Sequence, residues 1–308
     1  MYPNGRKRRK KGNPVHGWVV LDKPYNVGST PMVGKVRWLF SAAKAGHAGT
    51  LDPLATGILP IALGEATKTV PFMMEAAKSY TFEITWGESR TTQDTEGEVT
   101  ARSDVLPTAE QITAALPEFT GDIEQVPPKF SAIKIDGKRA YDLARAGEAV
   151  EIKSRSVRVD RFEFVGAAQN TATFDVDCGK GTYIRSLARD LSAALGACGY
   201  VSLLRRTRVG PFTLKQSITL DELQQMCDRA RVSEGLLSVS TALDDIPVLA
   251  VTEQDAINLK HGRGIAAPPQ VQNELLDSEY IRTEWDGVLI ALCQPRDGIL
   301  VPKRVFNL

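Results

Sequence analysis

The clearest capacity for chemistry lies in one glycine-rich stretch of the chain, residues 46–60, with the sequence GHAGTLDPLATGILP. Its three glycines allow tight turns of the backbone, and Pro53 restricts the residue before it to extended backbone. Asp52 is therefore expected on a rigid corner, where a carboxylate can meet a substrate with little conformational entropy left to lose. The same spacing also fits an ordinary Asp-Pro turn, and spacing alone favours the turn.

Positive charge gathers in two segments that could bind an anionic substrate. Residues 180–208 hold six bases and one acid, and residues 129–158 hold eight bases and four acids. Tyr141 and Tyr183 are aromatic side chains able to stack on nucleic-acid bases, as RNA recognition requires. The alternative is a solvated helix face together with a lysine-rich loop. Composition alone leaves these two interpretations evenly matched.

The overall charge hides a basic N-terminal arm. The 308 residues carry a net charge of +1, but Arg6–Lys11 contribute six bases without an acid, so the remainder of the chain is at −5. Hydrophobic content of 43% and charged content of 24% are typical of a soluble globular protein. No apolar run approaches the roughly 18 residues of a membrane helix, and no apolar signal-peptide region follows the arm. We expect a cytoplasmic protein without a membrane partner.

Several kinds of site are missing from the sequence. The four cysteines, Cys178, Cys198, Cys227 and Cys293, lack metal-ligand spacing and are interpreted as small buried side chains in a reducing compartment. The three histidines form no H-x-x-x-H pair, and there is no G-x-S-x-G nucleophile turn. Glycine-rich loops that cradle phosphates or dinucleotides are also missing. We therefore expect neither a metal nor a cofactor.

The hydrophobic pattern predicts an α+β fold that must position these residues. Residues 79–86 alternate cleanly, so that Tyr80 shares one face of a strand with three apolar side chains. Residues 44–57 are expected as a loop, residues 88–106 as irregular chain, and residues 108–116 as a helix that begins with a capping box. Further strands are expected at 17–21, 58–63, 157–165 and 171–178, and further helices at 31–42, 182–195, 219–231 and 253–260. Connections by both hairpins and helices favour α+β over a parallel doubly wound sheet.

Five segments together resemble the ordered motifs of one known family. They are GHAGTLDPLATGILPIALGEATK, KSYTFEITWG, QVPPKFSAIKIDGKRAYDLARAG, GTYIRSLARDLSAALG and LLRRTRVGPF, and the opening HGWVVLDKPYNVGST fits as well. Nearly all of residues 16–212 closely resembles the TruB family of tRNA pseudouridine synthases. The resemblance implies the pseudouridine synthase fold, with a central mixed and mostly antiparallel sheet. It also implies a stand-alone enzyme, without guide RNA, metal or cofactor, that flips out uridine 55 of the tRNA T-loop and isomerises it to pseudouridine.

The resemblance assigns roles to individual residues. It makes Asp52 the catalytic carboxylate, acting either as a nucleophile or as a base at the ribose. A buried carboxylate stays ionised only beside a cation, and Arg185 matches the family's partner arginine, which can bind a carboxylate bidentately. Tyr80 matches the active-site tyrosine that stacks on the target base. The matched residues that evert the base or wall the uridine pocket are His47, Tyr183 and Leu204.

The resemblance also predicts a domain organisation. It implies a basic arm at 1–12, a catalytic domain at 13–243 and a small β-rich, PUA-like RNA-binding domain at 244–308. Within the catalytic domain, residues 125–151 match an insertion that clamps the T-loop. The C-terminal domain holds ten acids and six bases, which weakens the case that it binds RNA. The predicted RNA contacts are Lys68, Lys129, Lys134, Arg139, Arg145, Arg205 and Arg206.

Two alternative functions remain open at this point. One is a non-catalytic RNA-binding or tRNA-folding chaperone with the same fold, a role that could also coexist with catalysis. The other is a guide-dependent synthase of the H/ACA type. The arm Arg6–Lys11 lies outside the matched motifs and is interpreted as a phosphate-binding tail, with a nuclear signal or a solubility tail as the alternative. We expect a monomer whose partner is the T-arm of tRNA.

Overall fold

The computed structural model divides the chain into two compact units. The first unit comprises residues 1–52, 59–74 and 215–308, and the second comprises residues 53–58 and 75–214. The residues that the structure describes are 12–131, 134–135, 138–139, 152–268 and 278–308. The predicted arm Arg6–Lys11 and the predicted RNA contact Arg145 lie outside them. The domain boundaries expected from the sequence stay a prediction.

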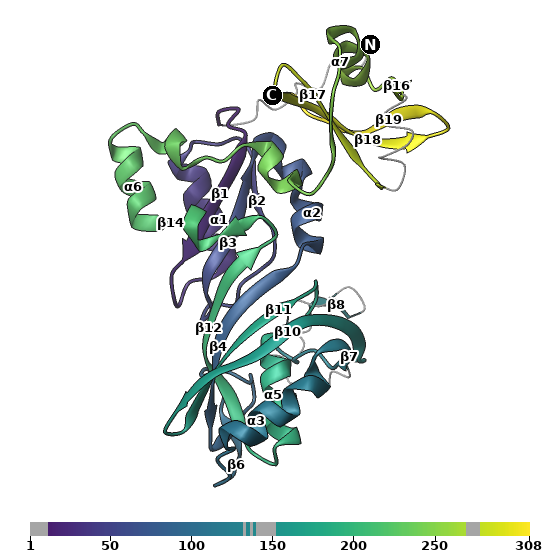
Figure 1. Cartoon of the computed structure of the whole chain (residues 1–308). Coiled ribbons are helices and arrows are strands. Elements are labelled where there is room, and N and C mark those ends of the chain that lie inside the picture. The colour runs from purple at the N-terminus through teal and green to yellow at the C-terminus, as the bar shows by residue number, and fades with distance from the viewer. Residues whose placement is uncertain (1–11, 132–133, 136–137, 140–151, 269–277) are drawn as a thin grey trace, which may run out of the picture. The chain divides into compact units, whose positions relative to one another are not determined.

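Ten strands form a mixed sheet in the order β14-β1-β3-β12-β4-β11-β10-β7, with β13 paired to β12 and β2 paired to β3 (Figure 1). The pairs β1–β14 and β3–β12 are parallel, whereas β12–β4, β4–β11, β11–β10 and β10–β7 are antiparallel. The predicted α+β fold with a mixed, mostly antiparallel sheet is confirmed. The strands are β1 (Gly17–Lys23), β2 (Ala45–His47), β3 (Thr56–Leu63), β4 (Lys78–Trp86), β7 (Gly121–Gln125), β10 (Arg155–Ala168), β11 (Thr171–Cys178), β12 (Gly199–Val209), β13 (Phe212–Thr213) and β14 (Ile218–Thr219).

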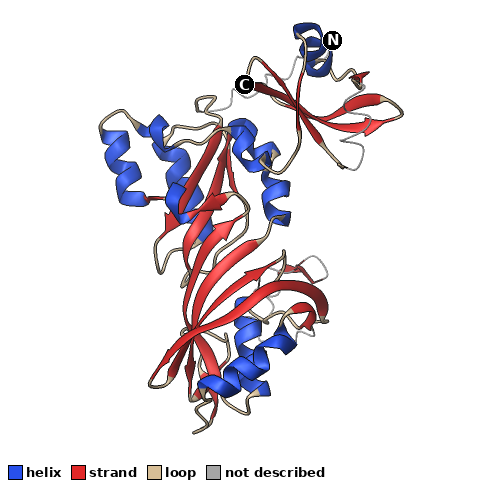
Figure 2. Cartoon of the chain, viewed as in Figure 1, coloured by secondary structure: helices blue, strands red, loops and turns tan. Residues whose placement is uncertain are grey.

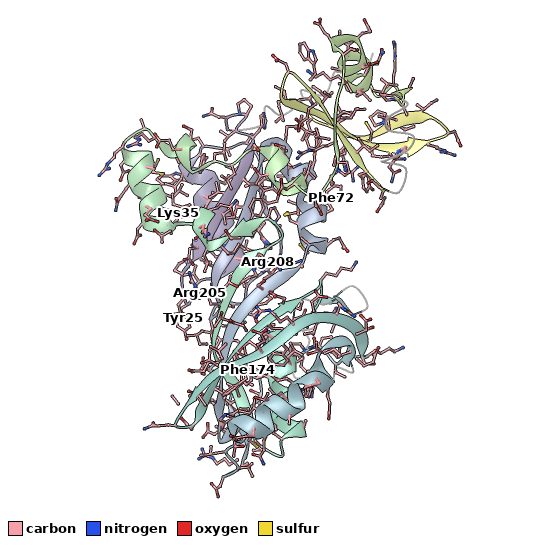
Figure 3. The ribbon with its side chains drawn as sticks, viewed as in Figure 1. Tyr25, Lys35, Phe72, Phe174, Arg205 and Arg208 are labelled. Atoms are coloured by element: carbon pink, nitrogen blue, oxygen red, sulfur yellow. The ribbon has the colours of Figure 1, made fainter. Side chains whose placement is uncertain are left out.

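A cluster of buried side chains fills the second unit between its strands and two helices. The helices α3 (Ala109–Ala115) and α5 (Ile184–Ala194) pack on one face of β4, β10, β11 and β12 (Figure 2). Three aromatic rings, those of Phe82, Phe162 and Phe174, meet in this core with centroids 5.2, 5.6 and 5.8 Å apart; Phe174 is labelled in Figure 3. Burial of such rings is a main source of stability, so this core gives the second unit a rigid framework.

Helix α1 (Ser29–Leu39) of the first unit begins earlier than the sequence predicts. The sequence predicts a helix from residue 31, but the helix begins at Ser29 and is capped by Gly28 without a side-chain hydrogen bond. The hydroxyl of Ser29 is instead bonded in both directions to the main chain of Leu51. A contact distant in the sequence therefore lies at the start of this helix, and α1 packs against β2.

The C-terminal residues form a second, five-stranded sheet that belongs to the first unit, in the order β15-β17-β18-β19-β16. Its β-rich character is as predicted. Helix α7 packs on it, burying Leu259 against Ile281 and Ile290. These elements are β15 (Val248–Ala250), α7 (Glu253–Lys260), β16 (Ile265–Ala266), β17 (Ile281–Trp285), β18 (Val288–Arg296) and β19 (Ile299–Val305). Within the described part of the chain, no helix is both long and apolar enough to cross a membrane.

Three local predictions need correction. The loop expected at 44–57 contains β2, which pairs with β3. The irregular chain expected at 88–106 contains the hairpin of β5 (Glu88–Arg90) and β6 (Val99–Arg102). Strand β12 was not expected, because its arginines break the apolar alternation of a buried strand. The remaining short elements are α2 (Val70–Glu75), α6 (Leu220–Asp228), β8 (Lys134–Ile135), β9 (Lys138–Arg139), η1 (Gly64–Lys68), η2 (Leu116–Phe119), η3 (Leu214–Gln216), η4 (Val232–Gly235) and η5 (Val239–Leu243).

The parallel pairing of β3 with β12 depends on Gly57. This residue has φ of +95°, and a Cβ atom there would lie 2.2 Å from the main-chain oxygen of Arg206. We expect Gly57→Ala to lower the free energy of unfolding by about 2–4 kcal/mol, because strain and overpacking add. Urea unfolding would measure this. The control is Gly34→Ala in α1, where a Cβ meets nothing within 4 Å, and this variant should be as stable as the wild type or more stable. Equal changes in the free energy of unfolding in the two variants would contradict the claim that the close approach at Gly57 excludes a side chain.

Candidate active site

The loop that carries Asp52 is held from both sides in the first unit. Strand β2 pairs antiparallel with β3, and the amide of Ala48 donates to the carbonyl of Pro60 over 3.0 Å. On the other side, the buried Ser29 hydroxyl accepts a hydrogen bond from the Leu51 amide (2.8 Å) and donates one to the Leu51 carbonyl (2.9 Å). The residue before Asp52 is thus clamped through both of its main-chain polar groups. The half-buried Asp52 follows at the corner that the sequence predicted.

His47 lies on the same hairpin as Asp52. It is the last residue of β2, pairs with Ile61 of β3 and is half-buried. The first unit thereby carries two of the predicted site residues five positions apart on one structural element. Their roles at the target nucleotide stay predictions.

Arg185 is a buried cation near the start of α5 in the second unit. Its side chain is only 6% exposed. The guanidinium donates to the main-chain carbonyls of Thr92 (2.9 Å) and Phe130 (3.0 Å) and forms an ion pair with Asp94 at 3.5 Å. A guanidinium with several fixed acceptors has one orientation, which suits a group that must present its charge in a defined direction.

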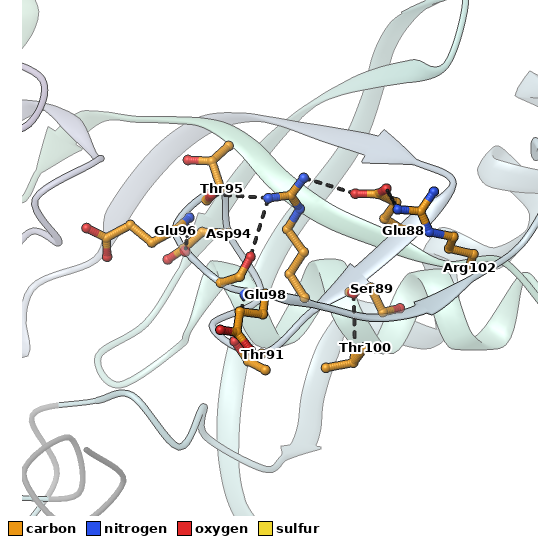
Figure 4. A network of polar contacts seen from close by, with 11 residues as sticks. Glu88, Ser89, Thr91, Asp94, Thr95, Glu96, Glu98, Thr100 and Arg102 are labelled. Carbon is orange, nitrogen blue, oxygen red and sulfur yellow. Dashed lines mark hydrogen bonds and ion pairs between the residues drawn. The ribbon is translucent and has the colours of Figure 1, made fainter. Parts of the chain in front are cut away.

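Asp94 is a functional candidate that the sequence interpretation missed. It is 8% exposed and lies in the turn between β5 and β6, where its carboxylate accepts from Thr92 Oγ1 and, over 3.1 Å, from the Glu96 amide. The turn is tied together by Arg90, which donates to main-chain oxygens of residues 95 and 97 and to Glu88; Glu88, Asp94 and Thr95 are labelled in Figure 4. The available signal was an acid inside a polar TTQDTEG turn, which by itself is typical of a surface loop.

Tyr80 and Leu204 line the edge of the second unit's core. Tyr80 lies on β4 and points to the face of Phe82, but it is half-buried whereas Phe82 is 0% exposed. Leu204 pairs with Phe82 across β12 and packs against the same cluster. The structure therefore brings these two predicted residues onto one apolar surface, with Tyr80 near the end of the strand. This position suits both packing and contact with a base.

Tyr183 is positioned through its main chain. The buried Gln125 side chain accepts from the Tyr183 amide (2.8 Å) and donates to its carbonyl (3.2 Å). The guanidinium of Arg155 lies 5.2 Å from the centre of the tyrosine ring, within the range of a cation–π contact. Gln125 is a second residue that sequence reasoning missed. Because Tyr183 is the N-cap of α5, Gln125 fixes where this helix begins and therefore where Arg185 lies.

The predicted RNA contacts differ in accessibility. Lys129 is exposed and Arg205 is half-buried, and Arg205 and Arg208 are labelled in Figure 3. Arg206 is 2% exposed and donates to the Ile58 carbonyl over 2.7 Å, which argues against the predicted RNA contact because a guanidinium buried in this way cannot reach a phosphate. Lys134 and Arg139 lie on the short hairpin of β8 and β9.

Lys68 has partners inside the first unit. Its ammonium donates to Glu65 (2.6 Å) and to the Val305 carbonyl (2.7 Å). Burial alone would raise the pKa of Glu65, but the hydrogen bonds from Lys68 and from the Asn307 amide, together with the Lys68 charge, hold it below its usual value. The C-terminal strand is bonded to η1 through these groups. The predicted RNA contact of Lys68 stays a prediction, and these bonds give it a structural role.

The strands of the second unit also bury ionisable groups. Burial, reinforced by repulsion from Arg206, lowers the pKa of Lys78 to about 8. Burial raises the pKa of the Cys178 thiol to about 12, so this cysteine behaves as the small buried side chain that the sequence predicted. Among the described residues, no group of three or more His, Cys, Asp or Glu side chains is arranged to hold a metal ion.

Solved structures share this fold. It is similar to a chain in "Crystal Structure of a Cbf5-Nop10-Gar1 Complex", with a TM-score of 0.73 and 23% identity over 98% of this chain and 93% of that one. A chain in "Structure of H/ACA RNP bound to a substrate RNA containing 2'-deoxyuridine" gives a TM-score of 0.72 and 22% identity over 99% and 92%. The fold is therefore that of the pseudouridine synthases.

Sequence comparison identifies the family within that class. Residues 37–184 match the TruB family pseudouridylate synthase N-terminal domain, and residues 185–245 match the tRNA pseudouridylate synthase B C-terminal domain. The chain is 55% identical to tRNA pseudouridine synthase B of Caulobacter sp. (strain K31), over 98% of this chain and 99% of that protein. It is 52% identical to the protein of the same name from Bradyrhizobium diazoefficiens, over 99% and 89%. The chain belongs to the TruB family of pseudouridylate synthases.

Ser29 should act as a positioning residue for Asp52. Ser29→Ala leaves the buried amide and carbonyl of Leu51 without their partner, which we expect to lower the free energy of unfolding by about 1–3 kcal/mol. The rate of pseudouridine formation at saturating RNA should fall as well, because the loop before the carboxylate loosens. Single-turnover kinetics and urea unfolding measure the two effects. The exposed neighbour Thr30→Ala is the control, and loss of stability with an unchanged rate would show that Ser29 has a structural role only.

Asp94 should hold Arg185 in its working orientation. We expect Asp94→Asn to reduce the rate at saturating RNA by about tenfold or more, because the buried guanidinium loses its carboxylate partner and its orientation. The substrate concentration for half-maximal rate should change less than the rate itself. The matched control is Asp160→Asn on the exposed side of β10, which should change neither quantity. A normal rate in the Asp94 variant would remove this residue from the site.

Proposed function

We propose that the protein converts uridine 55 in the T-loop of tRNA to pseudouridine as a stand-alone enzyme. The observation that carries the proposal is 55% identity, over 98% of the chain, to a protein named tRNA pseudouridine synthase B. The motifs around Asp52, Tyr80 and Arg185 support the target position, because they resemble those of the family.

The proposed reaction exchanges one glycosidic bond for another. The bond from ribose C1′ to uracil N1 breaks, the flipped uracil turns, and a bond forms from C1′ to uracil C5. C5 then loses its proton and N1 takes one up, so that the product is an isomer of the substrate. Asp52 acts as a nucleophile or as a base at the ribose, and the family resemblance assigns Arg185 as its partner arginine. The buried and multiply bonded guanidinium of Arg185 supports this role. Base extrusion costs a few kcal/mol, which stacking on Tyr80 and contacts with His47 would offset.

The remaining proposals concern substrate handling. Residues 13–243 form the catalytic domain, residues 125–151 clamp the T-loop, and residues 244–308 form a PUA-like domain. We place the reaction in the cytoplasm, on the T-arm, with a monomeric protein and without a guide RNA. The leucine and tyrosine of the pocket, Leu204 and Tyr183, would wall the uridine.

Replacing Asp52 tests the proposal directly. Asp52→Asn should abolish tritium release from tRNA labelled at uracil C5 and leave tRNA binding largely intact, because the amide keeps the shape of the side chain but supplies neither a nucleophile nor a base. The exposed Asp104→Asn is the matched control. Near-normal release by the Asp52 variant would reject the assignment.

Two substrates define the target and the guide requirement. A tRNA with cytidine at position 55 should give no release, and an isolated T-arm stem-loop should react with the purified protein alone. Tritium release from the cytidine-55 tRNA would show that the target uridine lies at another position. A reaction that requires an added RNA would favour the guide-dependent alternative. Full biological activity of the Asp52 variant would favour the chaperone.

A further inference from the structure

One arginine of strand β10 differs from the other two in what surrounds its charge. The strand carries Arg155, Arg158 and Arg161. Arg158 and Arg161 each form two ion pairs with carboxylates, at distances between 2.6 and 3.2 Å. Within the part of the chain that the structure describes, no carboxylate pairs with Arg155. Its positive charge is therefore available to an anion that does not belong to the protein.

Arg155 lies on the face of β10 that contributes to the core. Side chains alternate along a strand, so Arg155 shares its face with Val157 and Val159, which are 5% and 0% exposed. It is the first residue of the strand, pairs with Gln125 of β7 (Figure 1) and is half-buried. Arg158 lies on the opposite face and is exposed. A cation at the end of an apolar row buries its stem and keeps its guanidinium at the edge of the core.

The guanidinium of Arg155 lies beside Gly181 and Tyr183, where α5 begins. Its Nη2 group donates to the Gly181 carbonyl, and its central carbon lies 5.2 Å from the centre of the Tyr183 ring. Gly181 has φ of +82°, and a Cβ atom there would lie 3.3 Å from the same Nη2 atom. A glycine thus suits both the backbone conformation and the close approach of the guanidinium.

Most hydrogen-bond donors of this guanidinium are not used by the described residues. A guanidinium has five N–H donors, and the bond to Gly181 uses one of them. Among the described residues, the buried Nε atom has no hydrogen-bond partner, although a buried donor without an acceptor is costly. The bond to Gly181 is at the surface, so the terminal nitrogens can be reached from solvent. An acceptor with several oxygens, such as a phosphate, fits the remaining donors.

A purely structural role explains only part of this arrangement. The bond to Gly181 ties the start of β10 to the loop before α5, and the ring contact packs the guanidinium against Tyr183. Tyr183 is already fixed through both of its main-chain polar groups by the side chain of Gln125. The contacts of Arg155 orient its guanidinium, but neither of them neutralises its charge.

The position of Tyr183 indicates which anion would meet this charge. In the proposed function, Tyr183 walls the pocket that takes the flipped uridine. A base and its phosphate belong to the same nucleotide, so a base in that pocket brings backbone phosphates to the mouth of the pocket. Phosphates are the charged groups of RNA, and arginine is a common partner for them.

We propose that Arg155 binds a backbone phosphate next to the flipped uridine and so helps to hold the nucleotide in its everted conformation. The inference rests on the proposed function, because it takes the pocket beside Tyr183 as the place of the reaction. Gly181 and Tyr183 orient the guanidinium before the RNA binds, and the phosphate accepts from the donors that remain. Arg155 is a substrate-binding residue and takes no part in the chemistry at Asp52.

Substitution of Arg155 tests the contact in the Asp52→Asn background, which separates binding from turnover. Arg155→Gln should raise the Kd for a T-arm stem-loop about tenfold at low salt. It should also reduce the slope of log K against log salt by about 0.7–0.9, the value for one phosphate contact. Arg155→Lys keeps the charge and should restore the slope but only part of the affinity, because an ammonium lacks the planar fork. Filter binding measures both quantities.

The matched control is Arg158→Gln, which removes an arginine from the opposite face of the same strand. Its charge is already paired with Asp122 and Asp160, so the Kd and the slope should stay as they are. Urea unfolding of each variant shows whether the protein is folded at the temperature of the binding assay.

RNAs with single neutral phosphates locate the partner of Arg155. Each phosphate of the loop is replaced in turn with a methylphosphonate, which removes one charge. At a phosphate that flanks nucleotide 55, the replacement should raise the Kd of the Asp52→Asn protein about tenfold. The same RNA should change the Kd by less than twofold when the protein also carries Arg155→Gln, because the contact is already lost. A neutral phosphate in the stem is the control and should affect both proteins equally.

The outcomes separate this inference from the proposed function. Unchanged binding by the Arg155→Gln variant would overturn the phosphate contact, even if the wild-type protein releases tritium from uridine 55. Losses that add to those of every neutral phosphate would overturn it too, because Arg155 would then have a structural role only. Conversely, coupling at a phosphate beside a different uridine, together with tritium release from that uridine, would reject position 55 and support the role of Arg155.

Discussion

A buried guanidinium needs an acceptor for its hydrogens, and the architecture around Arg185 follows from that constraint. Burial of an unpaired charge is among the most expensive events in folding. In the second unit, the Arg185 guanidinium has two main-chain carbonyls as acceptors, from Thr92 and Phe130, and the carboxylate of Asp94 as its ion-pair partner. These acceptors come from two separate loops. The conformations of both loops are therefore coupled to one cation that the proposed chemistry requires.

The same logic explains the polar groups around the loop of Asp52. A rigid corner next to a proline is useful only if the preceding residue is fixed, and the buried hydroxyl of Ser29 fixes it through two hydrogen bonds. The helix α1 also starts at this serine, two residues before the start that the sequence predicts. Local propensity is thus overruled where a distant contact positions a functional group.

Patterns that depend on near neighbours were readable from the sequence. The alternation on β4 and the capping box at Thr108 depend on contacts within a strand or a helical turn, and both appear in the structure. Strand β12 escaped prediction because Arg206 occupies a buried position and satisfies its guanidinium with the Ile58 carbonyl. Asp94 escaped because its significance depends on Arg185, a residue far along the chain. Pairings of this kind have no periodic signature.

Charge counts, for the same reason, indicate a partner only after internal pairing is subtracted. The segment 180–208 looked like an RNA-binding face, yet several of its bases have acceptors inside the protein: Lys180 with Glu75, Arg189 with Asp190, Arg208 with Asp177, and the buried Arg185 and Arg206. Only cations without such partners retain a field that reaches solvent. Counting bases along the sequence therefore overstates the charge that this segment offers to a phosphate backbone.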